Sequence, residues 1–132
     1  MSAQKNASIR TPLARVRGLG SAHGGTSDFF RQRVTAFGMA LLIVPVAVIL
    51  VMLVGRDQAA ARALLGSPIA AIVMTLFIVA GCLHMKIGVQ VVIEDYLHGE
   101  AIKILAIVAN NFFSFAVGLA SIYAIFKLSV GS

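Results

Sequence analysis

His84 closes a long uncharged run, PIAAIVMTLFIVAGCL, and the same segment ends on Glu94, Asp95 and Tyr96. If the segment is a membrane-spanning helix, His84 lies roughly 14 Å from its polar end. Ionisable side chains at that depth are rare and usually mark functional sites. Asp95 follows His84 by eleven residues, close to three helical turns, and so returns to the same face. His84 and Asp95 are therefore candidates for shared chemistry.

Small residues flank this histidine on its own face, Gly81 before it and Gly88 after it. A strip without side chains allows two membrane helices to approach closely. It also allows a broad planar group to lie against the backbone, and haem iron takes histidine as an axial ligand. His84 could instead be a hydrogen-bonded histidine of the helix bundle or a member of a proton relay. The residues alone leave these interpretations open.

A haem with two histidine ligands would need a second histidine, and the other two lie outside the apolar runs. His23 belongs to the N-terminal segment and His98 to the polar stretch LHGE. A second chain would therefore have to supply the other ligand. The single cysteine, Cys82, cannot build a zinc or iron–sulfur site alone, and we interpret it as a packing residue.

Tyr96 stands at the expected membrane boundary, where tyrosine is a common interfacial anchor. Its phenol could also donate a hydrogen bond to a quinone carbonyl, and the neighbouring carboxylate of Asp95 could help to supply protons. The position of Asp95 on the histidine face favours this second interpretation of the pair.

Two arginines, Arg31 and Arg33, stand just before the first apolar run. They fit membrane orientation and contact with lipid headgroups; the functional alternative is a cation for a haem propionate or for the acidic surface of a soluble partner. Asp28 could pair with either arginine or cap the first helix. Asn110 and Asn111, in the third apolar run, are expected to make hydrogen bonds between helices.

The composition is that of a membrane protein. Hydrophobic residues make up 59% and charged residues 12% of the 132 positions, against roughly 45–50% and roughly 25% in soluble domains. At about 20 residues per span, the length allows three spans and a tail but no separate soluble catalytic domain. The net charge of +6 comes from Lys and Arg in the N-terminal segment and at the ends of apolar runs. This distribution favours membrane orientation over binding to nucleic acid.

We therefore expect an all-α membrane protein that forms part of a heteromeric helix bundle. A basic cytoplasmic tail over residues 1–33 would precede a three-helix anchor domain over 34–128. The apolar runs predict three spans, at about 34–54, 68–93 and 101–128. Pro45 is expected to kink the first span. The stretch GRDQAAARALLGS between the first two spans is expected to be a short loop with a helical turn.

The distribution of basic residues predicts which side of the membrane each end occupies. Lys and Arg occur six times before the first span, at Lys5, Arg10, Arg15, Arg17, Arg31 and Arg33. The first loop has only Arg56 and Arg62, so the N-terminus is expected to be cytoplasmic. The N-terminal segment lacks the apolar core of a secretory signal. Its composition resembles a mitochondrial presequence, but a flexible cytoplasmic tail is the preferred interpretation.

Two segments, SDFFRQRVTAF and HMKIGVQVVIEDYLHGE, resemble the hydrophobic membrane anchor subunits (D subunits) of succinate dehydrogenase, complex II, of the alphaproteobacterial type. The resemblance includes the three-span layout with a cytoplasmic N-terminus and covers most of the chain from about Gly18. Its specific part is a histidine followed by a glycine four positions on and by Asp-Tyr eleven and twelve positions on. The sister cytochrome b subunit typically shows Ser-x-x-His-Arg before its first span, where this chain has FFRQR.

The resemblance implies a subunit that is not an enzyme on its own. With a cytochrome b subunit, it would hold the flavoprotein and iron–sulfur subunits at the lipid bilayer for electron transfer from succinate to ubiquinone. The bacterial inner membrane is the expected location, in preference to the mitochondrial inner membrane.

The resemblance also implies roles for individual residues. His84 would be one axial ligand of a haem b shared with the cytochrome b subunit, with Gly88 and Arg33 near the haem, and Tyr96 and Asp95 would belong to the quinone site. Two alternatives remain: a fumarate reductase anchor, and a small proton-coupled transporter or channel subunit with His84 and Asp95 as the relay.

Overall fold

The structure, a computed structural model, describes residues 22–131, and over this range it consists of helices without any strand. The helices are α2 (Ala22–Leu53), α3 (Gln58–Leu65), α4 (Pro68–Tyr96) and α5 (Glu100–Val130). Of these, α2, α4 and α5 are long and apolar enough to cross a membrane. The prediction of an all-α chain with three spanning helices is confirmed for this part of the chain. The cytoplasmic position of the N-terminus stays a prediction.

Helix α2 begins at Ala22, well before the apolar run that predicted it. The expected tail therefore falls partly on residues 1–21, which lie outside the described residues, and partly on the first turns of α2. One contact favours helix in this polar stretch: the Cζ atom of Arg33 lies 5.0 Å from the ring centroid of Phe29, one turn earlier. Arg31 and Arg33 thus lie on a regular helix.

The stretch between α2 and α4 forms a two-turn helix, α3, where we expected a loop with a helical turn. Its alanines favour helix, and Asp57 caps it by accepting a hydrogen bond from the Ala60 N–H at 2.8 Å. Gly55, with a φ of 74°, allows the chain to reverse after α2. At Gly66 an added Cβ would lie 2.6 Å from the carbonyl oxygen of Leu128. Because Gly66 has no side chain, the end of α3 can lie close to the end of α5.

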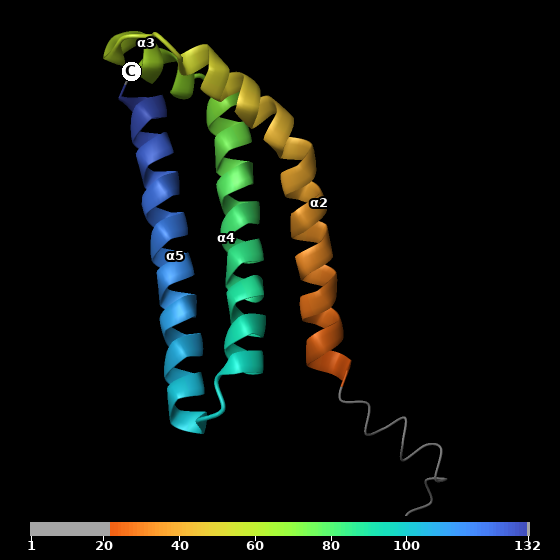
Figure 1. Ribbon diagram of the computed structural model, residues 1–132. Helices are drawn as coiled ribbons and strands as arrows, with labels where there is room; N and C mark the ends of the chain where they lie inside the picture. The colour runs from red at the N-terminus through yellow and green to blue at the C-terminus, as the bar shows by residue number, and fades with distance from the viewer. Residues whose placement is uncertain (1–21, 132) are drawn as a thin grey trace, which may run out of the picture.

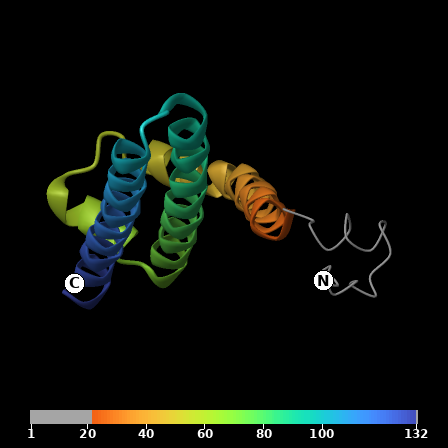
Figure 2. The same ribbon diagram turned by 90° about the horizontal axis from the view of Figure 1, so that it is seen from below.

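The three long helices lie in an open row with α4 in the centre (Figure 1). Helix α4 packs against both α2 and α5, whereas α2 and α5 make no contact with each other within the described residues. The view along the helices shows the same row (Figure 2). Helix α2 curves toward α3 in the half that contains Pro45, where proline removes one backbone hydrogen bond and bends the helix. The expected kink is therefore present.

The described residues bury very little apolar surface. The buried apolar side chains are Val46, Ile49, Ala70 and Ile87, and no large side chain is fully enclosed. In water such a helix row would leave most of its apolar surface exposed at a large free-energy cost. In a bilayer that surface can contact lipid or further helices, which agrees with the expected heteromeric bundle.

Asn110 joins α5 to α4. Its side chain is 8% exposed, and its Nδ2 donates a hydrogen bond to the Lys86 carbonyl oxygen at 2.8 Å. The expected interhelical hydrogen bond is thus confirmed for Asn110. The neighbouring Asn111 differs, because its Oδ1 is buried without a hydrogen-bond partner.

Replacement of Asn110 by alanine is expected to weaken the contact between α4 and α5. Hydrogen bonds between membrane helices contribute about 0.6 kcal/mol on average and up to about 1.7 kcal/mol. The free energy of unfolding of the chain in mild detergent would fall by an amount in this range. The matched control is Asn111→Ala, which removes no hydrogen bond within the described residues. An equal loss in both variants would contradict the assignment to the Asn110 hydrogen bond.

Candidate functional site

His84 lies in the central part of α4 and faces α2. Its ring is half-buried, and its Nδ1 atom lies 3.2 Å from the Oγ1 atom of Thr35 on α2. The other ring nitrogen, Nε2, has no hydrogen bond with any described residue. The described residues also contain no cluster of three or more His, Cys, Asp and Glu side chains that could hold a metal ion. Any metal at His84 would therefore use this imidazole together with groups from elsewhere.

The two glycines beside His84 also face α2. A Cβ added at Gly81 would lie 3.9 Å from the Cε of Met39, and one added at Gly88 would lie 3.4 Å from the Nε2 of Gln32. The strip without side chains therefore accommodates α2, which agrees with the interpretation as close helix packing. This approach of the two helices is what brings the Thr35 hydroxyl to the His84 ring.

Asp95 and Tyr96 are the last two residues of α4. Both are exposed, Tyr96 to 75%, and neither makes a hydrogen bond within the described part of the chain. About 16 Å of helix separates Asp95 from His84 along the axis. The chain therefore holds two separate groups of candidate residues, one within the span and one at its end.

A cavity of about 240 Å³ with a mostly apolar lining lies between α2 and α4, in the region between these two groups. Its polar lining consists of Asp28 and Gln32 from α2 and Gln90 and Glu94 from α4. Gln90 Nε2 donates a hydrogen bond to Glu94 Oε1 at 2.8 Å, whereas Gln32 Oε1 is buried without a partner. A buried acceptor without a partner is the kind of group that an internal water satisfies. This cavity depends on how α2 packs on α4 and was not predicted from the sequence.

Arg33 does not lie beside His84. It is exposed, its guanidinium lies over the ring of Phe29, and it precedes Thr35 by two residues. Two residues correspond to about 200° around a helix, so Arg33 is on the side of α2 that faces away from His84. Within this chain, the guanidinium is available to lipid headgroups or to another subunit.

Sequence reasoning missed two residues, Thr35 and Lys86. Thr35 lies in the segment RVTAF, where a hydroxyl within an apolar run was the available signal, but its partner depends on the register of α2 on α4. Lys86 is a cation within an apolar run and two residues from His84. It is half-buried and lines a cavity of about 310 Å³ between α4 and α5, together with Asn111 and Ser114.

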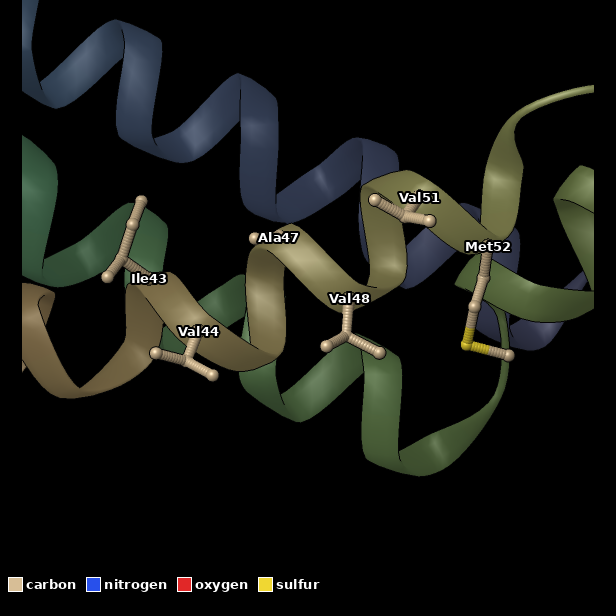
Figure 3. A pocket seen from close by; sticks show the side chains of 6 residues that line it. All are labelled: Ile43, Val44, Ala47, Val48, Val51 and Met52. Atoms are coloured by element: carbon tan, nitrogen blue, oxygen red, sulfur yellow. The ribbon is translucent and has the colours of Figure 1, made fainter.

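The groove on the second half of α2 has a different character. Figure 3 shows its six labelled side chains, Ile43, Val44, Ala47, Val48, Val51 and Met52, all carried by α2. The groove has a volume of about 440 Å³ and no polar side chain. It offers no group for catalysis or metal binding and is suited to contact with lipid or with an apolar helix.

Comparison with known proteins gives a family match over residues 7–118, to the succinate dehydrogenase/fumarate reductase transmembrane subunits. The chain is 31% identical over 122 residues to the succinate dehydrogenase hydrophobic membrane anchor subunit of Paracoccus denitrificans, covering 92% of this chain and 94% of that protein. It is 27% identical over 118 residues to the subunit of the same name from Rickettsia bellii (strain RML369-C), covering 89% and 94%. No solved structure matches the chain significantly.

Proposed function

The chain belongs to the family of succinate dehydrogenase and fumarate reductase transmembrane subunits, and from this we propose that it is the membrane anchor of a succinate–ubiquinone oxidoreductase. As a non-catalytic subunit, it would hold the flavoprotein and iron–sulfur subunits at the membrane together with a cytochrome b subunit. The names of the Paracoccus and Rickettsia relatives support the anchor role. The open row of helices supports it too, because its exposed apolar faces suit a partner's helices.

The observation that carries the proposal is the state of His84. Its Nδ1 has a partner in Thr35, and its Nε2 has none among the described residues, so the imidazole fits the role of one axial ligand to haem b. The haem would supply a one-electron carrier within the membrane. His84 is the only histidine within the three candidate spans, Gly25–Leu53, Pro68–Tyr96 and Glu100–Val130, so the cytochrome b subunit would give the other ligand.

Gly88 and Arg33 are proposed to lie in the vicinity of the haem. Gly88 lies one turn from His84 and keeps that part of α4 free of a side chain, although Gln32 of α2 uses some of the space. Arg33 is exposed and, as a cation, would suit a propionate. Because it is on the far side of α2 from His84, it would reach a haem propionate only across the interface with the partner subunit.

Tyr96 and Asp95 are proposed to form this chain's part of the ubiquinone site. The Tyr96 phenol would donate a hydrogen bond to a quinone carbonyl, and the Asp95 carboxylate would help to supply protons. Both side chains are exposed and free of hydrogen bonds within the described residues, so other subunits would complete the site. The basic residues before the first span support a cytoplasmic N-terminus, and the bacterial relatives support a location in a bacterial inner membrane.

The family includes fumarate reductase subunits as well, and an anchor that serves the reverse reaction is the second candidate function. The two differ in the quinone that they use. Turnover of the purified complex with quinones of high and low potential would distinguish them.

Replacement of His84 by alanine is expected to remove most of the haem from the assembled complex, because the iron loses a protein ligand. The complex would be purified in mild detergent through a tag on this chain, and its visible spectrum recorded after succinate and then dithionite. His98→Ala, in the exposed segment between α4 and α5, is the matched control and should keep its haem. Unchanged haem content in His84→Ala would reject the ligand assignment.

Replacement of Tyr96 by phenylalanine is expected to lower the rate of quinone reduction about tenfold or more, equivalent to about 1.4 kcal/mol in the barrier. Succinate oxidation with an artificial acceptor should stay at the wild-type rate, because the soluble subunits are untouched. Tyr123→Phe changes the other tyrosine, on α5, and is the control. Wild-type quinone turnover in Tyr96→Phe would leave Tyr96 as an interfacial anchor only.

A further inference from the structure

The Thr35 side chain links the backbone of α2 to the imidazole of His84. Its Oγ1 lies 2.8 Å from the carbonyl oxygen of Arg31 and 3.1 Å from that of Gln32, both in the preceding turn of α2. The same oxygen lies 3.2 Å from His84 Nδ1. One hydroxyl group thus has three close neighbours, two oxygens of its own helix and one nitrogen of the facing helix.

The chemistry of these neighbours determines where the protons lie. A hydroxyl has one proton to donate and two lone pairs, whereas a backbone carbonyl can only accept. The short contact with the Arg31 carbonyl therefore requires the hydroxyl proton, which points back along α2. In this arrangement the hydroxyl offers only lone pairs to His84, so the contact at 3.2 Å is a hydrogen bond in the tautomer that carries the proton on Nδ1. The neutral imidazole then bears its free lone pair on Nε2.

We propose that Thr35 is a positioning residue that holds His84 in the Nδ1–H tautomer with Nε2 ready to bind iron. The proposal rests on the proposed role of His84 as a haem ligand and deepens it. Metal-bound histidines generally donate their other N–H to an acceptor, which fixes the ring and raises the basicity of the ligand. Here that acceptor is a hydroxyl oriented by the backbone of α2.

The packing of the two helices makes this contact possible. Gly81 and Gly88 leave room for Met39 and Gln32 of α2, so the backbones approach closely on either side of His84. Thr35 and His84 are both half-buried. Within the hydrocarbon there is little water to replace the hydroxyl, so its loss would leave Nδ1–H without a partner.

A purely structural role for Thr35 makes a different prediction. If the Thr35 hydroxyl only donates a hydrogen bond to the Arg31 carbonyl, its removal would change the stability of the complex but leave the bound haem unaltered. If it holds the ligand, its removal weakens electron donation from the imidazole, which favours ferrous over ferric iron. The reduction potential of the haem therefore separates the two roles.

The test uses the whole complex with Thr35→Val, which keeps the shape but removes the hydroxyl, and Thr35→Ser, which keeps the hydroxyl. The haem potential would be measured by redox titration, and the ferric haem by electron paramagnetic resonance. We expect Thr35→Val to show a more positive potential and altered ferric resonances, and Thr35→Ser to stay close to wild type. Thr75→Val, the same substitution on α4, is the control and should change neither signal.

Three outcomes would overturn the inference: an unchanged potential and spectrum in Thr35→Val, an equal shift in Thr35→Ser, or an equal shift in Thr75→Val. If Thr35→Val does not assemble, Thr35→Cys replaces it. A thiol is a weaker acceptor, so we expect a shift in the same direction, and no shift would reject the inference. His84→Ala is measured in parallel. Retention of haem in His84→Ala would refute the proposed ligand. Loss of haem in His84→Ala, together with an unchanged haem potential and spectrum in Thr35→Val, would refute only the role of Thr35.

Discussion

Hydrocarbon offers no hydrogen-bond partners, and this constraint governs every polar side chain within the spans. The Thr35 hydroxyl meets it by donating to its own helix, His84 meets it through Thr35, and Asn110 meets it through the Lys86 carbonyl. In each case the partner belongs to this chain. The contacts of His84 and Asn110 link α4 to α2 and to α5 at defined positions along the helices.

The same constraint shows where buried polar atoms of this chain need hydrogen-bond partners from outside it. The Oε1 of Gln32, the Oδ1 of Asn111 and the Oγ of Ser114 are buried and lack partners among the described residues. All three line cavities beside α4, one toward α2 and one toward α5. Native membrane proteins seldom leave such groups unsatisfied, so water or neighbouring subunits are expected to complete them. The helices form an open row (Figures 1 and 2), and cavities of about 240 Å³ and about 310 Å³ lie beside these atoms.

Much of the fold could be predicted from the sequence, because uninterrupted apolar runs and a proline at Pro68 determine spans and a helix start locally. The common face of His84 and Asp95 followed from helical spacing alone. Thr35 could not be assigned a partner, since the register of α2 on α4 is not a local property. For the same reason the sequence could not tell that Gly88 faces Gln32. The haem and quinone roles of these residues stay predictions.

The open row also has a consequence for the chain before it meets its partners. Helices α2 and α5 do not enclose α4, and Asn111 and Ser114 keep unsatisfied atoms in the gap beside it. A newly inserted, solitary copy therefore carries an energetic penalty that assembly would relieve. Cells continuously remove marginally stable chains by proteolysis. On this basis we expect an unassembled copy to be degraded faster than one whose buried polar atoms are satisfied in a complex.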